Sequence, residues 1–256
     1  KGPNIKKINK EINVIDQLTE VINIGRKKAK ELVKEYNIKS VSDLKKRNKS
    51  GEIELNSKIL LGLKYYNKVK LNIPRNESDK YYKLFKEVGL ELDKDLIITI
   101  CGSYRREKKT SNDIDVLITH KKIITDNDKK KNINYLVKFI EILKKLKVLK
   151  DDMTDGKIIT KYMGFCRLKN KPIRRIDIRY VPYRSYYPAL LYFTGSYKLN
   201  QDMRQFAKSL GYKLNEYGLY KITIKDDKEK FRFIKVKSEK DIFDKLGLDY
   251  LEPKER

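Results

Sequence analysis

The feature that most constrains this chain is the stretch IITICGSYRREKKTSNDIDVLITH, from Ile97 to His120. It opens with an apolar run that predicts a buried strand, closed by Gly102. After a turn, the segment DIDVLI alternates polar and apolar residues, which in a strand puts Asp113 and Asp115 on one face. Two carboxylates on one face repel each other unless a cation lies between them. The stretch therefore predicts two strands that carry a cation site.

The turn between these strands carries groups that suit phosphate oxygens. A hydroxyl group and two guanidinium groups, from Ser103, Arg105 and Arg106, lie beside the backbone amides of the glycine turn. Phosphates next to paired carboxylates indicate a divalent metal that binds a nucleoside triphosphate.

A second alternating segment supplies a third carboxylate. KYMGFCRLKNKPIRRIDIRYVPY predicts a hairpin with strands at Tyr162–Leu168 and Arg174–Val181. Alternation in RRIDIRY puts Arg175, Asp177 and Arg179 on one face. If this strand lies beside DIDVLI, Asp177 joins the two other aspartates. The alternative is a surface strand of alternating charge.

The composition indicates a polyanionic partner. The 256 residues carry a formal net charge of +26, far beyond what solubility requires. A genome-wide bias toward Lys, Asn and Ile is the alternative explanation of this charge.

The two cysteines, Cys101 and Cys166, lie far apart and form neither a metal-ligand spacing nor a disulfide framework. We therefore expect an intracellular, reducing compartment. No segment is long or apolar enough to span a membrane, and no signal peptide is visible. The chain begins at Lys1 rather than Met, and we expect it to be a fragment of a longer protein.

The segment from Leu18 to Ile38 has the spacing of a helix-hairpin-helix, in which a tight turn points backbone amides at a DNA phosphate. An ordinary helical hairpin is the alternative. The residues expected at DNA are Gly25, Lys27 and Lys28. The backbone carbonyls expected to hold a monovalent ion are those of Thr19, Val21 and Ile24.

The predicted fold class is α+β. We expect a linker or the tail of an upstream region over residues 1–13, a helix-hairpin-helix subdomain over 14–73, and two further regions over 74–182 and 183–256, which the resemblance described below implies to be a catalytic palm and a nucleotide-binding subdomain. The palm is expected to hold a mixed β-sheet with helices, and the last subdomain to be a small α+β unit. His120, the only histidine, has no cysteine or histidine partner, and we expect it at the surface.

Together these residues resemble the family X DNA polymerases, most closely the DNA polymerase beta type. CGSYRR and SNDIDVLITH look like the nucleotidyltransferase motif of the family, and RRIDIR is similar to the strand with its third aspartate. YFTGS, the N-x-x-x-R of Asn200 to Arg204, NEY and EKDIFD look like its nucleotide-binding subdomain. The resemblance covers the chain from about Leu18 to Arg256.

The resemblance implies a role for each matching residue. Asp113 and Asp115 would bind two divalent ions, and Asp177 would bind the catalytic ion and take the proton from the primer 3′-hydroxyl. The incoming nucleotide would be bound by Ser103, Arg106, Ser111, Asn112, Tyr192, Phe193, Gly195 and Asn200. DNA would be bound by Gly25, Lys27, Lys28, Lys161, Arg175 and Arg204. Arg179, Glu216 and Tyr217 would support the open and closed conformations.

The activity implied is that of a template-directed DNA polymerase that fills short gaps in base excision repair. Its cofactors would be two Mg²⁺ ions, with Mn²⁺ as a substitute, and Na⁺ or K⁺ at the helix-hairpin-helix. Its partners would be gapped or primed DNA and dNTPs, and we expect a monomer that does not bind membranes. The alternatives are a template-independent nucleotidyltransferase and a catalytically silent DNA-binding protein. Arg204 at a template-contacting position and the short hairpin turn argue against the first, and three intact aspartates against the second.

The sequence departs from the family pattern at three positions. Asn23 replaces the first glycine of the hairpin turn, where asparagine tolerates the left-handed backbone. Asn72 replaces an arginine expected to help bind the triphosphate, and Tyr197 replaces an aspartate beside the nascent base pair. The amino-terminal lyase domain of the family is missing from this sequence.

Overall fold

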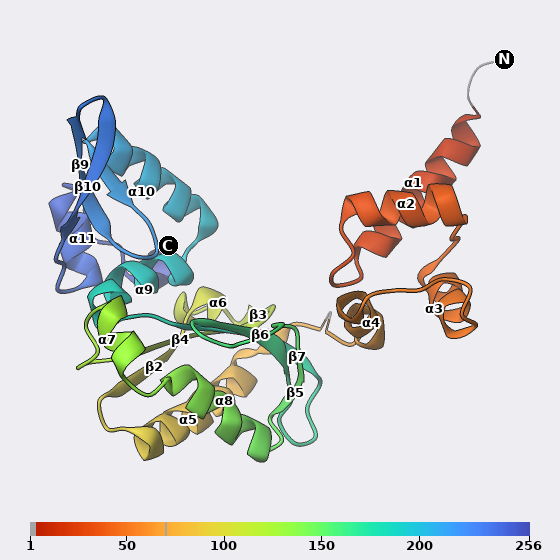
Figure 1. Cartoon of the computed structure of the whole chain (residues 1–256), viewed down its shortest axis with the longest axis horizontal. Helices are drawn as coiled ribbons and strands as arrows, with labels where there is room; N and C mark the ends of the chain where they lie inside the picture. The colour runs from red at the N-terminus through yellow and green to blue at the C-terminus, as the bar shows by residue number, and fades with distance from the viewer. Residues whose placement is uncertain (1–3, 70) are drawn as a thin grey trace. The chain divides into compact units, whose positions relative to one another are not determined.

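The computed structural model describes residues 4–69 and 71–256, and it has the α+β composition that the sequence predicts. Contacts divide the chain into two compact units, residues 1–70 and residues 71–256 (Figure 1). Both cysteines are buried and free. Within the described ranges, no helix combines the length and the apolar character needed to cross a membrane.

The first unit is helical. Its described helices are α1 (Ile5–Thr19), α2 (Arg26–Tyr36), α3 (Val41–Lys49) and α4 (Ser57–Lys64). The segment expected to be a linker or the tail of an upstream region, residues 1–13, is helical from Ile5 onward, where α1 begins; residues 1–3 lie outside the described ranges. The Asn4 side chain caps α1 by accepting a hydrogen bond from the Lys7 amide at 3.2 Å, and lysine-rich sequence retains high helix propensity.

The turn between α1 and α2 depends on two residues with special backbone requirements. Asn23 has a φ of 74°, so the prediction of a left-handed conformation is confirmed. Its Nδ2 donates to the Lys58 carbonyl oxygen at 2.9 Å. Gly62 on α4 lies so close to the turn that a Cβ there would be 1.8 Å from the carbonyl oxygen of Ile22. Helix α4 thus supports the turn through a backbone contact that only glycine permits.

The second unit contains three sheets and the remaining helices. Its palm portion is formed by β1 (Ile73–Pro74), α5 (Arg75–Leu92), β2 (Leu96–Ile100), α6 (Gly102–Arg105), β3 (Thr110–Ser111), β4 (Ile114–His120), α7 (Asp126–Lys131), α8 (Tyr135–Lys145), β5 (Leu149–Asp152), β6 (Lys161–Cys166) and β7 (Arg174–Tyr180). The carboxy-terminal portion is formed by η1 (Tyr183–Ser185), α9 (Tyr186–Thr194), α10 (Tyr197–Ser209), β8 (Tyr212–Leu214), β9 (Leu219–Lys225), β10 (Lys228–Ile234), α11 (Glu239–Lys245) and η2 (Pro253–Glu255).

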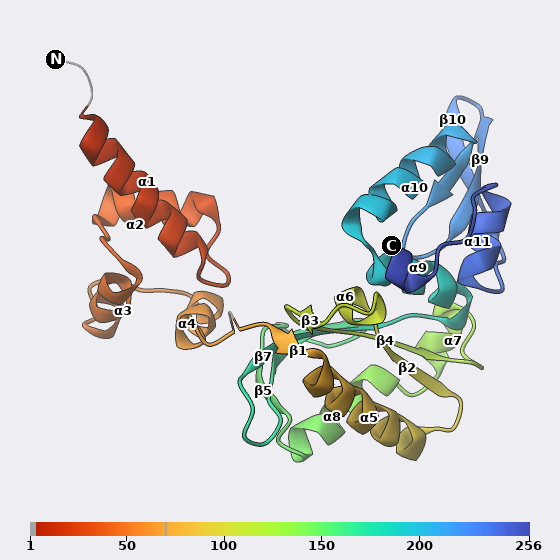
Figure 2. The ribbon, with the colours of Figure 1, turned by 180° about the vertical axis from the view of Figure 1, so that it is seen from behind.

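The central five-stranded sheet has the order β2-β4-β7-β6-β5, in which only β4 and β7 pair in parallel. Helices α5 and α8 cover one face (Figures 1 and 2), where Phe85 and Phe139 pack edge to face with their ring centroids 5.5 Å apart. On the other face, Leu117 packs with Ala189 and Leu190 of α9. Because both faces are covered, every residue of β4 except Asp115 is buried.

A buried ion pair ties β7 to the start of this unit. The Arg174 guanidinium donates to both carboxylate oxygens of Glu77 at 2.7 and 3.1 Å, and each side chain is only 3% exposed. The same guanidinium donates to the carbonyl oxygens of Leu71 and Asn72. These contacts fix the register of β7 against the segment that enters the sheet.

The carboxy-terminal portion packs α10 and α11 on a three-stranded antiparallel sheet of order β10-β9-β8. Its core contains Met203, Ala207, Leu219, Ile242 and Phe243. Strands β9 and β10 form a two-stranded ribbon that projects beyond the core (Figure 1).

We predict that Gly62→Ala destabilises the first unit by about 3 kcal/mol, the upper end for overpacking, because the new Cβ collides with the Ile22 carbonyl oxygen. Hydrogen exchange at the amides of α2 and α4, together with thermal unfolding, measures this effect. Leu60→Ala is the matched control, since Leu60 lies on the same helix with 41% of its side chain exposed. Equal stability of Gly62→Ala and the unsubstituted chain would contradict the close approach.

Candidate active site

Three carboxylates meet at one end of the central sheet. Parallel pairing of β4 and β7 sets Asp115 directly opposite Asp177, and Asp113 precedes β4 by one residue. The sequence prediction that these two strands lie side by side is therefore confirmed. Gly102, with a φ of +61°, faces the cluster, since a Cβ there would lie 3.7 Å from the Asp115 Cβ. The turn after β2 thus approaches the carboxylates at close range.

Asp113 and Asp115 both have raised pKa values. Burial, followed by the charges of Asp113 and Asp177, raises the pKa of Asp115 to about 7, against a small opposing effect of Arg179. Burial and the Asp177 charge also raise the pKa of Asp113, although part of its side chain stays exposed. Arg175 donates to Asp177 Oδ1 at 2.8 Å. This single ion pair neutralises only one of the three carboxylates, so the cluster has an excess of negative charge.

This donor set fits divalent metal ions. Carboxylate oxygens are the hard ligands that Mg²⁺ and Mn²⁺ prefer. Two of the three carboxyl groups have raised pKa values, because the negative charges are close together and partly removed from water. Cations bound among Asp113, Asp115 and Asp177 would relieve this repulsion.

The groups predicted to hold phosphates lie on α6 and on the segment before β4. Ser103 Oγ donates to Ser111 Oγ at 2.9 Å, which joins two of the predicted residues. Arg106 donates to the Thr194 carbonyl oxygen at 2.7 Å, and burial lowers its pKa. A Cβ at Gly195, where φ is +72°, would approach the Arg106 guanidinium to 3.2 Å. Glycine thus leaves room for Arg106 beside the break between α9 and α10.

The residues predicted to hold the sugar and base lie at this break. Asn200 Nδ2 donates to the Tyr192 carbonyl oxygen at 2.7 Å, and the Arg204 guanidinium lies 5.1 Å from the Tyr192 ring centroid. These three side chains line one small pocket. Tyr197, at the substituted position, begins α10 with 77% of its side chain exposed, and its hydroxyl accepts from Gln201.

The residues predicted to change conformation occupy a neighbouring pocket, which is lined by Arg179, Phe193, Glu216 and Tyr217. The Arg179 guanidinium lies 4.8 Å from the Phe193 ring centroid. Arg179 lowers the pKa of Asp115 through its charge, but among the described residues no ion pair joins the two. Glu216, which lines the same pocket as Arg179, forms its ion pair with Arg204 at 3.5 Å.

Other predicted residues belong to the first unit, or lie on β6 and just before β4. Those assigned to the helix-hairpin-helix belong to the first unit, and there the Val21 carbonyl already accepts the Ile24 amide at 3.1 Å. Lys161 begins β6 and pairs in register with Arg179 of β7. Asn112 is exposed just before β4. Their roles stay predictions.

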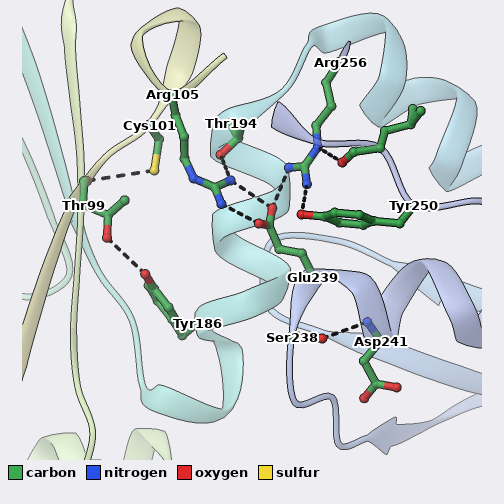
Figure 3. Close-up of polar contacts among 11 residues, drawn as sticks. Thr99, Cys101, Arg105, Tyr186, Thr194, Ser238, Glu239, Asp241, Tyr250 and Arg256 are labelled. Carbon is green, nitrogen blue, oxygen red and sulfur yellow. Dashed lines mark hydrogen bonds and ion pairs between the residues drawn. The ribbon is translucent and has the colours of Figure 1, made fainter. Parts of the chain in front are cut away.

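Sequence reasoning missed a largely buried network beside α6 (Figure 3). Arg105 donates to the Glu239 carboxylate at 2.5 Å and to Thr194 Oγ1 at 2.8 Å. From the other side, Arg256 donates to Glu239 at 2.6 Å, and its side chain is fully buried. Glu239 thus links α6 to the carboxy-terminal end. The motifs SYRR and EKDIFD mark Arg105 and Glu239, but no local pattern shows that they meet.

A second group with metal-ligand distances lies at the opposite end of β4. It contains Asp93, Asp95 and His120. His120 Nδ1 accepts the Lys122 amide at 3.1 Å, so the neutral ring carries its hydrogen on Nε2, which faces Asp93 at 3.1 Å. A hydrogen bond from the Asp95 amide, followed by the nearby His120 side chain, lowers the pKa of Asp93 to about 2. Nδ1 thus accepts the Lys122 amide while Nε2 faces Asp93 without an aligned hydrogen bond, and in this tautomer the imidazole offers a metal no lone pair.

His120 is buried, with 5% exposed, and stacks on Tyr135 with their ring centroids 5.0 Å apart. The prediction of a surface histidine is therefore wrong. The cause is packing of α8 over this end of the sheet, which the sequence near His120 does not reveal.

We predict that Asp115→Asn stabilises the chelator-treated protein above pH 7. The pKa of Asp115 is higher in the folded than in the unfolded protein, because burial favours the protonated carboxyl. The folded protein therefore keeps its full stability below about pH 3.8 and loses this contribution as the pH rises through about 7. Thermal unfolding at pH 6 and pH 8, with and without Mg²⁺, measures the effect. A change of about 1 kcal/mol in the free energy of unfolding shifts Tm by roughly 2–4 °C in a protein of this size. Mg²⁺ should stabilise the unsubstituted chain more than the variant. The exposed Asp202→Asn is the control, and an equal Mg²⁺ response in both chains would refute the prediction.

We predict that Glu239→Ala destabilises the second unit by about 3–5 kcal/mol, because it leaves the buried Arg256 guanidinium and Arg105 without their carboxylate. Urea unfolding followed by circular dichroism measures the loss. Asp244→Ala on the same helix is the control, since its pair with Lys240 is exposed and should contribute below about 0.5 kcal/mol. Similar losses of unfolding free energy in the two variants would contradict the prediction that Glu239 stabilises this unit through its ion pairs.

Comparison with known proteins places this geometry in a family. A family profile described as DNA polymerase beta palm matches residues 72–183, and one described as DNA polymerase beta thumb matches residues 189–256. A third, described as fingers domain of DNA polymerase lambda, matches residues 16–70.

Similar curated proteins include DNA polymerase lambda of Arabidopsis thaliana, 32% identical over 97% of this chain and 47% of the relative. DNA polymerase lambda of Rattus norvegicus is 30% identical over 97% of this chain and 43% of the relative. DNA nucleotidylexotransferase of Xenopus laevis is 30% identical over 94% of this chain and 51% of the relative. The chain spans about half the length of these relatives.

Among solved structures, the ternary primer–template complex of Leishmania infantum polymerase beta superposes with a TM-score of 0.86 at 33% identity, covering 96% of this chain and 99% of that one. Its ternary gap complex gives the same TM-score at 32% identity, covering 99% of this chain and 93% of that one. Similarity along the whole length of a solved relative, with all three carboxylates present, leads to one conclusion: this chain belongs to the polymerase beta and lambda family, the family X DNA polymerases.

Proposed function

We propose that this chain is a template-directed DNA polymerase that adds dNTPs to a primer 3′-hydroxyl, and that it fills short gaps during base excision repair. The observation that carries the proposal is the meeting of Asp115 and Asp177 on paired strands, with the Gly102 turn directly facing them. Family membership supports the same activity.

In this proposal the phosphate-binding side of the site is formed by Ser103, Arg106, Ser111 and the amide of Asn112. Arg106 and the α6 turn would hold the β- and γ-phosphates and so keep the α-phosphate near the carboxylates. The hydrogen bond between Ser103 and Ser111 supports this role, because it already orders the two hydroxyls.

Asp177 would accept the proton from the primer 3′-hydroxyl. Arg175 donates to its Oδ1 and limits the orientations of the carboxylate, which suits a group that must meet a single hydroxyl. Two divalent ions held by Asp113, Asp115 and Asp177, Mg²⁺ or in its place Mn²⁺, would supply Lewis-acid stabilisation of the charge on the phosphate oxygens. A raised pKa of Asp115 supports cation binding there.

The base and sugar of the nucleotide would lie against Tyr192, Phe193, Gly195 and Asn200, with Arg204 on the template strand. The shared pocket of Tyr192, Asn200 and Arg204 supports this assignment. Glu216 pairs with Arg204, and Arg179 covers Phe193, so a change in either contact would move the others. We assign the conformational roles of Arg179, Glu216 and Tyr217 on this basis.

DNA outside the active site would contact Gly25, Lys27 and Lys28 of the hairpin, Lys161 and Arg175, with Na⁺ or K⁺ bound by carbonyls of Thr19, Val21 and Ile24. The helical hairpin with its left-handed Asn23 supports this part of the proposal. We propose subdomains at residues 14–73, 74–182 and 183–256, a monomer, and a reducing compartment that suits two buried thiols.

Template-independent transfer is the second candidate, because one similar protein is named DNA nucleotidylexotransferase. Only residues 167–173 separate β6 from β7, which leaves a short turn at this hairpin. Arg204 also lies beside Asn200, where a templating nucleotide would contact it. Both observations favour template-directed synthesis over template-independent transfer.

Primer extension on a one-nucleotide gapped duplex with Mg²⁺ and all four dNTPs tests the proposal. Incorporation should follow the template and fall at least about 100-fold in Asp177→Ala, since metal ligation contributes several kcal/mol to transition-state stabilisation. Asp95→Asn is the matched control, because Asp95 lies at the opposite end of the same sheet. Addition regardless of template would favour the transferase, and DNA binding without incorporation would favour a silent binding protein.

A further inference from the structure

A groove beside the β9–β10 ribbon is lined, apart from Arg204, by charged and aromatic side chains that the proposed function does not use. Its volume is about 260 Å³, and its lining includes Arg204, Lys208, Lys213 and Phe231 with a single carboxylate, Glu229. Lys208 and Lys213 are exposed, and among the described residues neither forms an ion pair. The groove therefore has an excess of positive charge beside an aromatic surface.

Phe231 is held in a position from which a flat ligand can reach it. The ring packs edge to face on Tyr220, with centroids 6.5 Å apart, yet 45% of the residue is exposed. The Lys213 ammonium lies 4.4 Å from the ring centroid. A base stacked on this ring would free the ammonium to pair with a phosphate of the same nucleotide.

Arg204 connects this groove to the active site. It lines both the groove and the small pocket of Tyr192 and Asn200. From Arg204, Lys208 follows one helical turn later on α10, and Figures 1 and 2 show α10 and the ribbon side by side. A strand that leaves Arg204 therefore meets Lys208, Lys213 and Phe231 in turn.

The opposite face of the ribbon is also cationic. Lys221 pairs in register with Arg232, and Lys225 with Lys228. Like charges at directly opposed positions destabilise a ribbon, and no ion pair involves these four side chains within the described ranges. A polyanion near the ribbon would relieve this repulsion, which favours nucleic acid over an uncharged partner.

We propose that this groove binds the unpaired template strand ahead of the nascent base pair, with a base stacked on Phe231 and phosphates at Lys208 and Lys213. The inference rests on the proposed polymerase function, since it takes Arg204 as the template contact. Alternating cations and an aromatic ring are the features by which proteins hold single strands without sequence preference. The site would orient the template before each nucleotide enters.

The test compares two labelled duplexes by fluorescence anisotropy, one blunt and one with a 5′ template extension of roughly four thymidines, a length within single-strand site sizes. The unsubstituted chain should bind the extended duplex more tightly. Phe231→Ala should lose roughly 5- to 150-fold of affinity for the extended duplex and none for the blunt one, whereas Phe231→Tyr should retain it. Ile224→Ala is the matched control, being 75% exposed on the same ribbon face but outside the groove.

Lys208→Ala provides a second readout that does not disturb the ribbon. It should lower the salt dependence of binding to the extended duplex by about 0.7 in log–log slope, the value for one single-strand phosphate contact. If the variants lose equal affinity for both duplexes, or if no variant loses affinity, the groove does not bind the template strand. Either result would leave the polymerase proposal intact. Failure of the unsubstituted chain to bind either duplex would overturn the polymerase proposal itself.

Discussion

Repulsion among three carboxylates is the constraint on which the rest of this structure depends. Parallel pairing of β4 and β7 forces Asp115 and Asp177 to adjacent positions, and burial together with the charges of Asp113 and Asp177 raises the pKa of Asp115 to about 7. Such an arrangement costs stability unless cations neutralise it. Packing in the surrounding fold offsets this destabilisation. Helices on both faces of the sheet bury the strands and so keep the carboxylates from separating.

Two sets of ion pairs with buried carboxylates hold the elements around this cluster. Arg174–Glu77 fixes β7 to the segment entering the sheet, and Glu239 joins Arg105 of α6 to Arg256. Both arrangements satisfy charged groups with several hydrogen bonds, which burial requires. The site is therefore positioned by charge as well as by apolar packing. Through Glu239, α6 and the carboxy-terminal portion are tied together by one carboxylate.

Much of the fold and the site could be predicted from local patterns. Alternation in DIDVLI and RRIDIRY located β4 and β7, and the left-handed Asn23 followed from the preferences of asparagine. The helix that begins at Ile5 was not predicted, because lysine-rich sequence resembles a solvated tail even where a capped helix forms.

By itself, the sequence determined which segments are strands and helices, and which face of each carries carboxylates or cations, because side-chain periodicity follows backbone geometry. Only the tertiary structure decided which distant residues meet. Examples are the burial of His120 beneath Tyr135, the convergence of Arg105 and Arg256 on Glu239, and the groove that joins Arg204 to Phe231. The physical reason is that such contacts depend on how whole elements pack, and packing joins positions whose separation along the chain leaves no periodic signal.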